Sequence, residues 1–108
     1  MSLAVVKDGK ILELTHDGST AWTWQDTTYG WGATQDFLRV RYIHWIPAAA
    51  DNVICIKNGS TTGPIIMYAK AADVYDQRIL YFYNAPFRPV IDQTVTTGAN
   101  QKIVFFVK

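Results

Sequence analysis

The chain has 108 residues and carries ten basic and nine acidic side chains, which gives a formal net charge of +1. This length indicates a single domain with one hydrophobic core. An apolar share of 49% excludes a disordered chain. The near-zero net charge argues against nucleic acid as the main partner. Eight of the nine acids are Asp, and ten Ile, nine Val and eleven Thr stand against five Leu. This composition favours β-strands joined by turns over helices.

The first third of the chain predicts a β-hairpin followed by an aromatic segment. Asp8-Gly9 lies between two apolar runs, and it is a strong signal for a two-residue turn of type I′, which needs positive φ at both central residues. Residues 22–31 then carry four aromatic side chains among polar ones. Gly30 and Gly32 interrupt this segment, so we expect a loop or a bulge there.

The clearest predicted strand covers Phe37–Ile46 and ends before Pro47, which removes a hydrogen-bond donor. Its side chains alternate between two faces. One face consists of Leu38, Val40, Tyr42, His44 and Ile46 and is apolar apart from the histidine. The other face begins with charged residues and becomes apolar toward Trp45, as expected where solvent gives way to a covered surface.

Asn58-Gly59 predicts a second hairpin, and the segment after it has two interpretations. Residues 65–79 carry apolar side chains at helical spacing, which is typical of an amphipathic helix. The same residues also fit two strands, 65–70 and 78–83, joined by a linker. The β-branched and aromatic composition of both halves favours the two strands.

Two further strands are expected near the C-terminus, at residues 90–96 and 102–107, after a proline-containing loop at residues 84–89. The chain therefore contains seven to nine short strands separated by regular turn signals. This pattern predicts an all-β fold: a single-domain antiparallel β-sandwich or jelly-roll-like barrel over residues 1–108.

No combination of residues predicts a catalytic or metal site. His16 and His44 do not occur at spacings typical of metal ligands; we expect the first to be a solvated turn residue and the second a core or interface residue. Cys55 is the only cysteine and lies in an apolar run, so we expect a buried, inert thiol. Most of the Asp residues stand where turns are expected. These observations favour a non-enzymatic protein without a metal or cofactor.

The aromatic content is the feature that most needs a functional explanation. The candidate residues for interaction are Trp22, Trp24, Tyr29, Trp31 and Trp45. Three roles fit them: the hydrophobic core, a subunit interface, where Trp and Tyr are enriched, or stacking on the rings of a glycan. Burial at a subunit contact favours the interface, and an exposed coplanar row favours the glycan.

The second half of the chain resembles a known group of proteins. The motifs that carry the resemblance are Val53–Gly59, Gly63–Ile66, Pro86-Phe87 and Val95–Val107. They are similar to segments of small β-sandwich proteins encoded among the virion genes of tailed bacteriophages, over residues 40–107. The resemblance implies a structural or host-interaction protein of the virion, usually oligomeric and without catalytic residues.

Two functions follow as hypotheses. The first is a structural module that self-associates as a homo-oligomer, with other virion proteins as further partners. The alternative is a carbohydrate-binding module that holds a surface glycan through the Trp cluster. The sequence shows neither a signal peptide nor an apolar run of the roughly 20 residues that a membrane span needs, so we expect no membrane partner.

Overall fold

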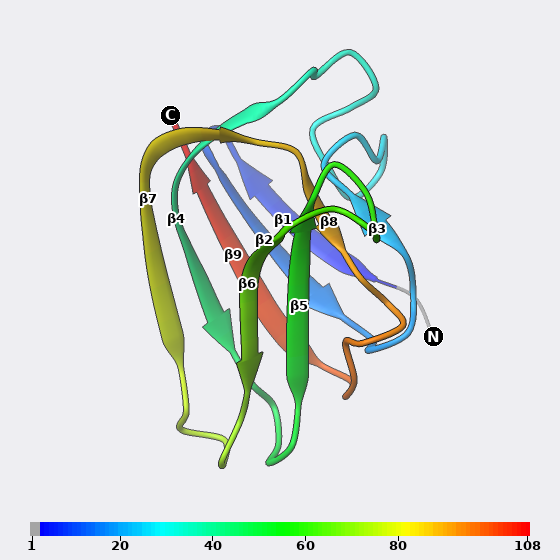
Figure 1. Cartoon of the computed structure of the whole chain (residues 1–108), viewed down its shortest axis with the longest axis vertical. Helices are drawn as coiled ribbons and strands as arrows, with labels where there is room; N and C mark the ends of the chain where they lie inside the picture. The colour runs from blue at the N-terminus through cyan, green and yellow to red at the C-terminus, as the bar shows by residue number, and fades with distance from the viewer. Residues whose placement is uncertain (1–2) are drawn as a thin grey trace.

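The computed structural model describes residues 3–108 and consists of β-strands joined by turns and loops (Figure 1). The strands are β1 (Ala4–Asp8), β2 (Ile11–His16), β3 (Trp22–Thr23), β4 (Leu38–Ile46), β5 (Val53–Asn58), β6 (Ile65–Lys70), β7 (Arg78–Phe87), β8 (Pro89–Ile91) and β9 (Gln101–Val107). The part of the chain that it describes contains no helix that is long and apolar enough to cross a membrane.

The strands form two antiparallel sheets that pack face to face. One sheet has five strands in the order β1-β2-β9-β4-β7, and the other has four in the order β3-β8-β5-β6. Figure 1 shows the four-stranded sheet in front of the five-stranded sheet. The predicted all-β fold is confirmed. Of the two expected forms it is the sandwich, because the two sheets share no strand.

The hydrophobic core lies between the two sheets. Trp22 of β3 stacks on Phe105 of β9 across the sandwich, with ring centroids 5.0 Å apart and an angle of 18° between the planes. Leu12 and Leu14 of β2 and Ile54 of β5 are fully buried beside them. Burying one such side chain stabilises the fold by roughly 1.5–3 kcal/mol, so this layer holds the sheets together.

The first hairpin forms, but its turn lies one residue further along than predicted. Asp8 pairs with Ile11, so the loop residues are Gly9 and Lys10. Gly9 has a φ of 58°, whereas Lys10 is not among the residues with positive φ. The prediction of a type I′ turn is therefore wrong, because that turn needs positive φ at both central residues. The second hairpin forms after Asn58, as predicted.

A bulge in β4 changes which of its residues face the core. Val40 pairs with Val107 and Tyr42 pairs with Phe106, so Arg41 is an extra residue relative to β9. Beyond the bulge the buried residues are Ile43 and Trp45, whereas Tyr42, His44 and Ile46 are half-buried on the outer face. The prediction that Leu38, Val40, Tyr42, His44 and Ile46 share one face is therefore wrong after residue 40, because one inserted residue reverses the two faces. The prediction that the other face becomes covered toward Trp45 is confirmed.

The region around residues 65–79 is built from two strands, as the composition predicted. β6 ends at Lys70 and β7 begins at Arg78, and residues 71–77 connect them. β7 then continues to Phe87 through a segment that the sequence predicted as a loop. β8 has only three residues, because the chain enters a turn at residues 93–95 instead of extending the predicted strand to residue 96.

Candidate functional site

Three of the five predicted interaction residues lie in the protein's own core. Trp22, Trp24 and Trp45 expose 1%, 7% and 0% of their surface. Each indole Nε1–H donates within the chain: Trp22 to the carbonyl of Tyr29 (2.8 Å), Trp24 to that of Gln35 (2.7 Å) and Trp45 to Oε1 of Gln101 (2.8 Å). Of the three roles open to these residues, burial selects the hydrophobic core for Trp22, Trp24 and Trp45. They are not available for a subunit or glycan contact, because one chain satisfies both their apolar surface and their polar group.

The other two predicted residues, Tyr29 and Trp31, are half-buried and pack against the core. Trp31 meets Phe105 edge to face with ring centroids 6.1 Å apart, and Lys7 Nζ lies 5.8 Å from its ring centroid. Trp31 also lines a hollow of about 210 Å³. The five predicted residues do not form an exposed row, so they lack the geometry that glycan stacking requires.

His16 is fully buried, which contradicts the prediction of a solvated turn residue. Its Nδ1 accepts a hydrogen bond from the backbone N–H of Gly18 (2.9 Å), and its Nε2 donates to the carbonyl of Thr20 (2.8 Å). These roles require a neutral ring, and burial lowers the pKa of His16. Burial of the adjacent Asp17 raises its pKa, but hydrogen bonds from Thr20 and Ser19 outweigh that effect and hold the pKa at about 2.

The remaining histidine and acids do not converge on one site. His44 Nε2 lies 3.0 Å from Oε1 of Gln77 on the outer face of β4. Across residues 3–108, no three His, Cys, Asp or Glu side chains are grouped closely enough to hold a metal ion. Four carboxylates instead accept backbone N–H bonds from residues two or three positions later: Asp17, Asp26, Asp73 and Asp92. The interpretation of Asp as a turn residue is confirmed for Asp17 and Asp26. Asp73, in the segment with two interpretations, also caps a turn, and Asp92, expected within a strand, caps one instead.

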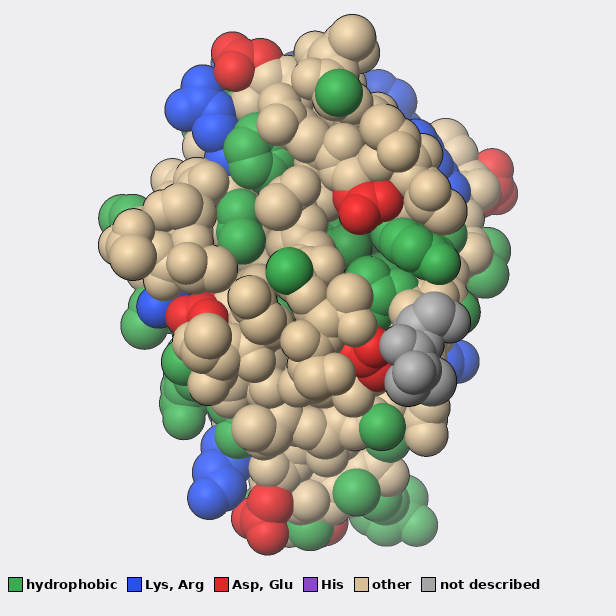
Figure 2. Space-filling model, turned by 90° about the vertical axis from the view of Figure 1, so that its right-hand side faces the viewer, with side chains coloured by type: hydrophobic (Ala, Val, Ile, Leu, Met, Phe, Trp, Pro, Cys, Tyr) green, Lys and Arg blue, Asp and Glu red, His purple; other side chains and the backbone are tan. Residues whose placement is uncertain are grey.

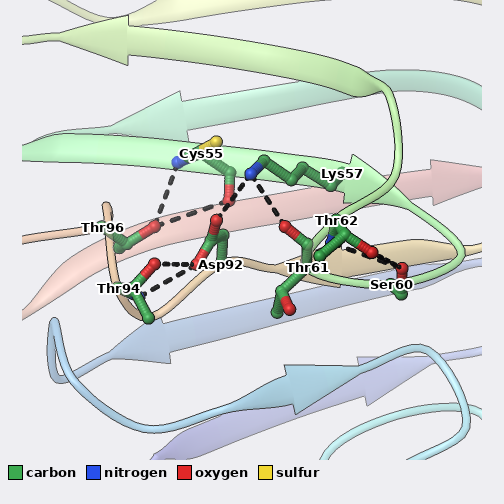
Figure 3. Close-up of polar contacts among 8 residues, drawn as sticks. All are labelled: Cys55, Lys57, Ser60, Thr61, Thr62, Asp92, Thr94 and Thr96. Atoms are coloured by element: carbon green, nitrogen blue, oxygen red, sulfur yellow. Dashed lines mark hydrogen bonds and ion pairs between the residues drawn. The ribbon is translucent and has the colours of Figure 1, made fainter.

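The most buried ion pair of the described residues joins β5 to the turn after β8 (Figure 3). Lys57 Nζ lies 2.7 Å from Oδ2 of Asp92, whose side chain is 3% exposed. The ammonium also donates to the carbonyl of Thr61 (2.8 Å), and Asp92 Oδ1 accepts from the backbone N–H and the hydroxyl of Thr94 (3.0 and 2.6 Å). Additional hydrogen bonds of this kind are needed for a buried ion pair to offset the cost of its desolvation.

Cys55 is buried beside this ion pair, as predicted, and its backbone N–H donates to the hydroxyl of Thr96 (3.0 Å). Burial raises the pKa of the Cys55 thiol. The hydrogen bond between Lys57 and Asp92 raises the pKa of the lysine and lowers the pKa of the aspartate, so both stay charged. A protonated amine cannot act as a nucleophile, and the oxygens of the Asp92 carboxylate are engaged by Lys57 and Thr94. The cluster therefore holds the turn onto β5.

The outer face of the five-stranded sheet carries a row of aromatic side chains that the sequence analysis did not single out. Tyr42 lies between Phe106 and Tyr81, because these residues pair across β9, β4 and β7. Its ring centroid is 4.2 Å from that of Phe106 and 5.4 Å from that of Tyr81. Tyr83 continues the row, 6.4 Å from Tyr81. We call these four residues the aromatic row; Tyr81 is 60% exposed and Tyr83 86%.

A hollow of about 290 Å³ lies beside the aromatic row at the bulge. Its lining consists of Arg41, Tyr42, Tyr81, Tyr83 and Asn84. Tyr83 and Asn84 have φ values of 52° and 65°, in the left-handed region. This region costs a residue such as Tyr83 roughly 1–2 kcal/mol, whereas Asn adopts it more readily. Such residues persist only where the surrounding structure enforces them, and they cluster at binding sites.

The neighbouring edge of the sheet is also apolar. β7 pairs with β4 on one side only, and it exposes Ile79 (46%) and Leu80 (36%). No charged residue occurs from residue 79 to residue 87. On the opposite side of the sandwich, toward β1 and β3, hydrophobic side chains are interspersed with polar and charged ones (Figure 2). The outer face and free edge of β7 therefore form the candidate interaction surface.

Comparison of the chain with protein-family models, curated proteins and solved structures finds no match. A signal for the aromatic row does exist in the sequence. In residues 80–83, Leu and Phe alternate with two tyrosines, and the hydroxyl-bearing rings mark the face that is turned to solvent.

Proposed function

We propose that this protein is a non-enzymatic structural module that self-associates by pairing the free edge of β7 with the same edge of a second copy. The observation that carries the proposal is the apolar first half of this strand. Among residues 3–108, no strand lies beside its backbone N–H and C=O groups on the side away from β4. Such groups are a template for pairing with another chain.

The other edges of the two sheets carry features that discourage pairing. β1 contains Lys7 and Asp8, β6 contains Lys70, and β3 is only two residues long. Edge charges and short edge strands are the usual protection against edge-to-edge association. In β7 the comparable features are Arg78 at its first position, Pro86, and Tyr83 with its left-handed backbone conformation. Between them, residues 79–82 carry neither a charge nor a proline and remain as an unprotected segment.

An antiparallel pair about a two-fold axis at Leu80 fits this segment. It places Leu80 opposite its own copy and Ile79 opposite Tyr81, so that apolar side chains meet on both faces of the joined sheet. Arg78 immediately precedes the segment and holds Asp76 in an ion pair of 2.9 Å. The charge at the end of the pairing segment is thus already compensated.

The size of this contact predicts a reversible dimer. Five paired residues extend over roughly 17 Å. Tyr81 is 60% exposed and adds roughly 120 Å² of the roughly 200 Å² that a tyrosine can bury. A standard stable interface buries roughly 800 Å² per partner, which is more than one short edge supplies. We therefore expect an affinity in the micromolar range.

The resemblance of residues 40–107 to virion β-sandwich proteins supports the further proposal that this assembly belongs to a phage particle. In that setting other virion proteins are additional partners. Self-association also suits a domain of 108 residues, because small domains bury a smaller share of their surface than large ones.

Sedimentation velocity over protein concentrations from about 1 to about 500 µM tests the proposal. We expect the wild-type mass to rise from that of a monomer to that of a dimer. Ile79→Lys places a charge on the free edge and is expected to keep the protein monomeric. Ile65→Lys is the matched control, because Ile65 is 60% exposed on the other long edge strand, β6; this variant should behave as the wild type.

Two results would overturn the proposed self-association. One is a wild-type protein that stays monomeric at every concentration. The other is a dimer that Ile79→Lys leaves intact. Circular dichroism of both variants confirms that a loss of dimer does not reflect a loss of fold.

A further inference from the structure

The hollow beside the aromatic row combines aromatic rings with hydrogen-bonding groups. Its five lining residues include three tyrosines, together with Arg41 and Asn84. Its volume of about 290 Å³ lies just below the roughly 300–1,000 Å³ that small-molecule pockets occupy. The hollow is therefore sized for a single ring, with the rest of a longer molecule lying outside it.

The bulge brings these polar groups to the tyrosines. Val40 pairs with Ala85 and Tyr42 with Tyr81, so three residues of β7, 82–84, lie opposite the single residue Arg41 of β4. A bulge of this kind re-aims side chains next to a binding site. Here Tyr83 remains beside Tyr81 despite its left-handed backbone.

Arg41 gives the hollow an uncompensated positive charge. The lining contains no carboxylate. Among residues 3–108, the arginines that form ion pairs are Arg78, with Asp76, and Arg88, with Asp36. Arg41 is exposed to solvent, and its guanidinium can therefore meet an anion without breaking an existing contact.

We propose that this hollow binds a carboxylate-bearing sugar ring, such as a uronic acid residue of an acidic polysaccharide. Tyr81 and Tyr83 cover the apolar C–H face of the ring. Arg41 pairs with the carboxylate through two parallel N–H groups. The amide of Asn84 both donates and accepts hydrogen bonds, as sugar hydroxyls do. This binding goes beyond the proposed self-association and does not depend on it. Because Tyr81 belongs to both the pairing segment and the hollow, the sugar and the second copy compete for its ring, and the hollow is complete in the monomer.

A single-stranded nucleic acid is the competing ligand, because its bases also stack on tyrosines. Binding of that class relies on several phosphate contacts along a positively charged groove. This protein has a net charge of +1, and Arg41 is the only cation in the lining. One cation next to three rings matches one carboxylate on one sugar better than it matches a phosphate backbone.

The test is a titration of the full chain with a trimer of galacturonic acid, in which binding is monitored through the NMR chemical shifts of the protein. We expect saturable shifts at the hollow. A neutral trimer of galactose is expected to bind about tenfold more weakly, because it lacks the charge-assisted contact. Arg41→Ala and Tyr83→Ala are each expected to weaken binding of the acidic trimer about tenfold.

Matched controls are available for both variants. Arg39 lies on the same strand, two residues from Arg41, and is also exposed. Tyr75 is 87% exposed, against 86% for Tyr83, and lies outside the hollow. Arg39→Ala and Tyr75→Ala should bind the acidic trimer as the wild type does. Their spectra, and those of the two hollow variants, also report whether the fold is intact.

Several results would overturn the acidic-sugar proposal. These are the absence of shifts with the acidic trimer at millimolar concentration, equal affinity for the neutral trimer, and binding that Arg41→Ala leaves unchanged. Tighter binding of a short thymidine oligonucleotide than of the acidic trimer would also overturn it, in favour of nucleic acid. A monomer in sedimentation together with selective binding of the acidic trimer would refute only the self-association.

Discussion

Replacing Gln101 by Met should destabilise the protein strongly, because this buried amide satisfies polar groups on both sheets. Its Oε1 accepts the indole N–H of Trp45 (2.8 Å), and its Nε2 donates to the carbonyls of Thr97 (3.0 Å), Gly98 (2.9 Å) and Val53 (3.3 Å). Gln101 is fully buried, so water cannot replace these contacts. A buried polar group left without a partner costs roughly 1–3 kcal/mol. Losing the partner of the indole and of the carbonyls at once predicts a loss of about 3 kcal/mol in the free energy of unfolding.

Guanidinium denaturation, monitored by tryptophan fluorescence, measures this decrease in the free energy of unfolding. A change of about 3 kcal/mol is a large part of the roughly 5–15 kcal/mol that stabilises a typical domain. Gln35→Met is the control, because Gln35 is exposed and should change the free energy by less than about 0.5 kcal/mol. Trp45→Phe removes the indole donor, and the double variant should show that the two losses are not additive. A loss below about 1 kcal/mol for Gln101→Met would refute the reasoning.

Three further predictions concern the turns and the thiol. Burial holds the pKa of His16 below its usual 6.5, so the unfolded chain takes up a proton that the native ring does not. The free energy of unfolding should therefore be highest above pH 6.5 and decrease below it. A second decrease is expected between pH 3.8 and about pH 2, as Asp17 is protonated. A pH series of denaturation curves checks this, and a flat profile across pH 6.5 would contradict it. Gly98→Ala should lower the melting temperature more than Gly9→Ala. Both glycines have positive φ, but a Cβ at Gly98 would clash with the side-chain amide of Asn52, whereas Gly9 faces open space. Only the backbone strain of roughly 1 kcal/mol applies at Gly9, and equal losses of stability would contradict the steric argument. Cys55 should react with a thiol reagent only after denaturation, because it is 1% exposed and its pKa is raised; fast labelling of the native protein would show that the strand opens.

The local features of the fold were predictable from the sequence because they depend on neighbouring residues. Strand composition identified both halves of residues 65–79, and Asn58-Gly59 identified a hairpin. The acid at the Asp17-Gly18 turn was also predictable, since a carboxylate binds backbone N–H groups two or three residues away; Asp92 was not, because it was expected within a strand. The same reasoning underestimated β7, because its second half is held by pairing with a distant strand and not by local preference.

The sequence by itself determined the fold class and most strand positions of this protein, because alternation and turn chemistry act over a few residues. Only the tertiary structure decided which side chains reach solvent. The extra residue Arg41 turns Tyr42 outward, the packing of β3 on β9 removes Trp22 from the surface, and the strand order leaves β7 at an edge. Each of these outcomes depends on pairing between strands that are far apart in the chain. The candidate site therefore lies on the tyrosines and not on the tryptophans that the composition singled out.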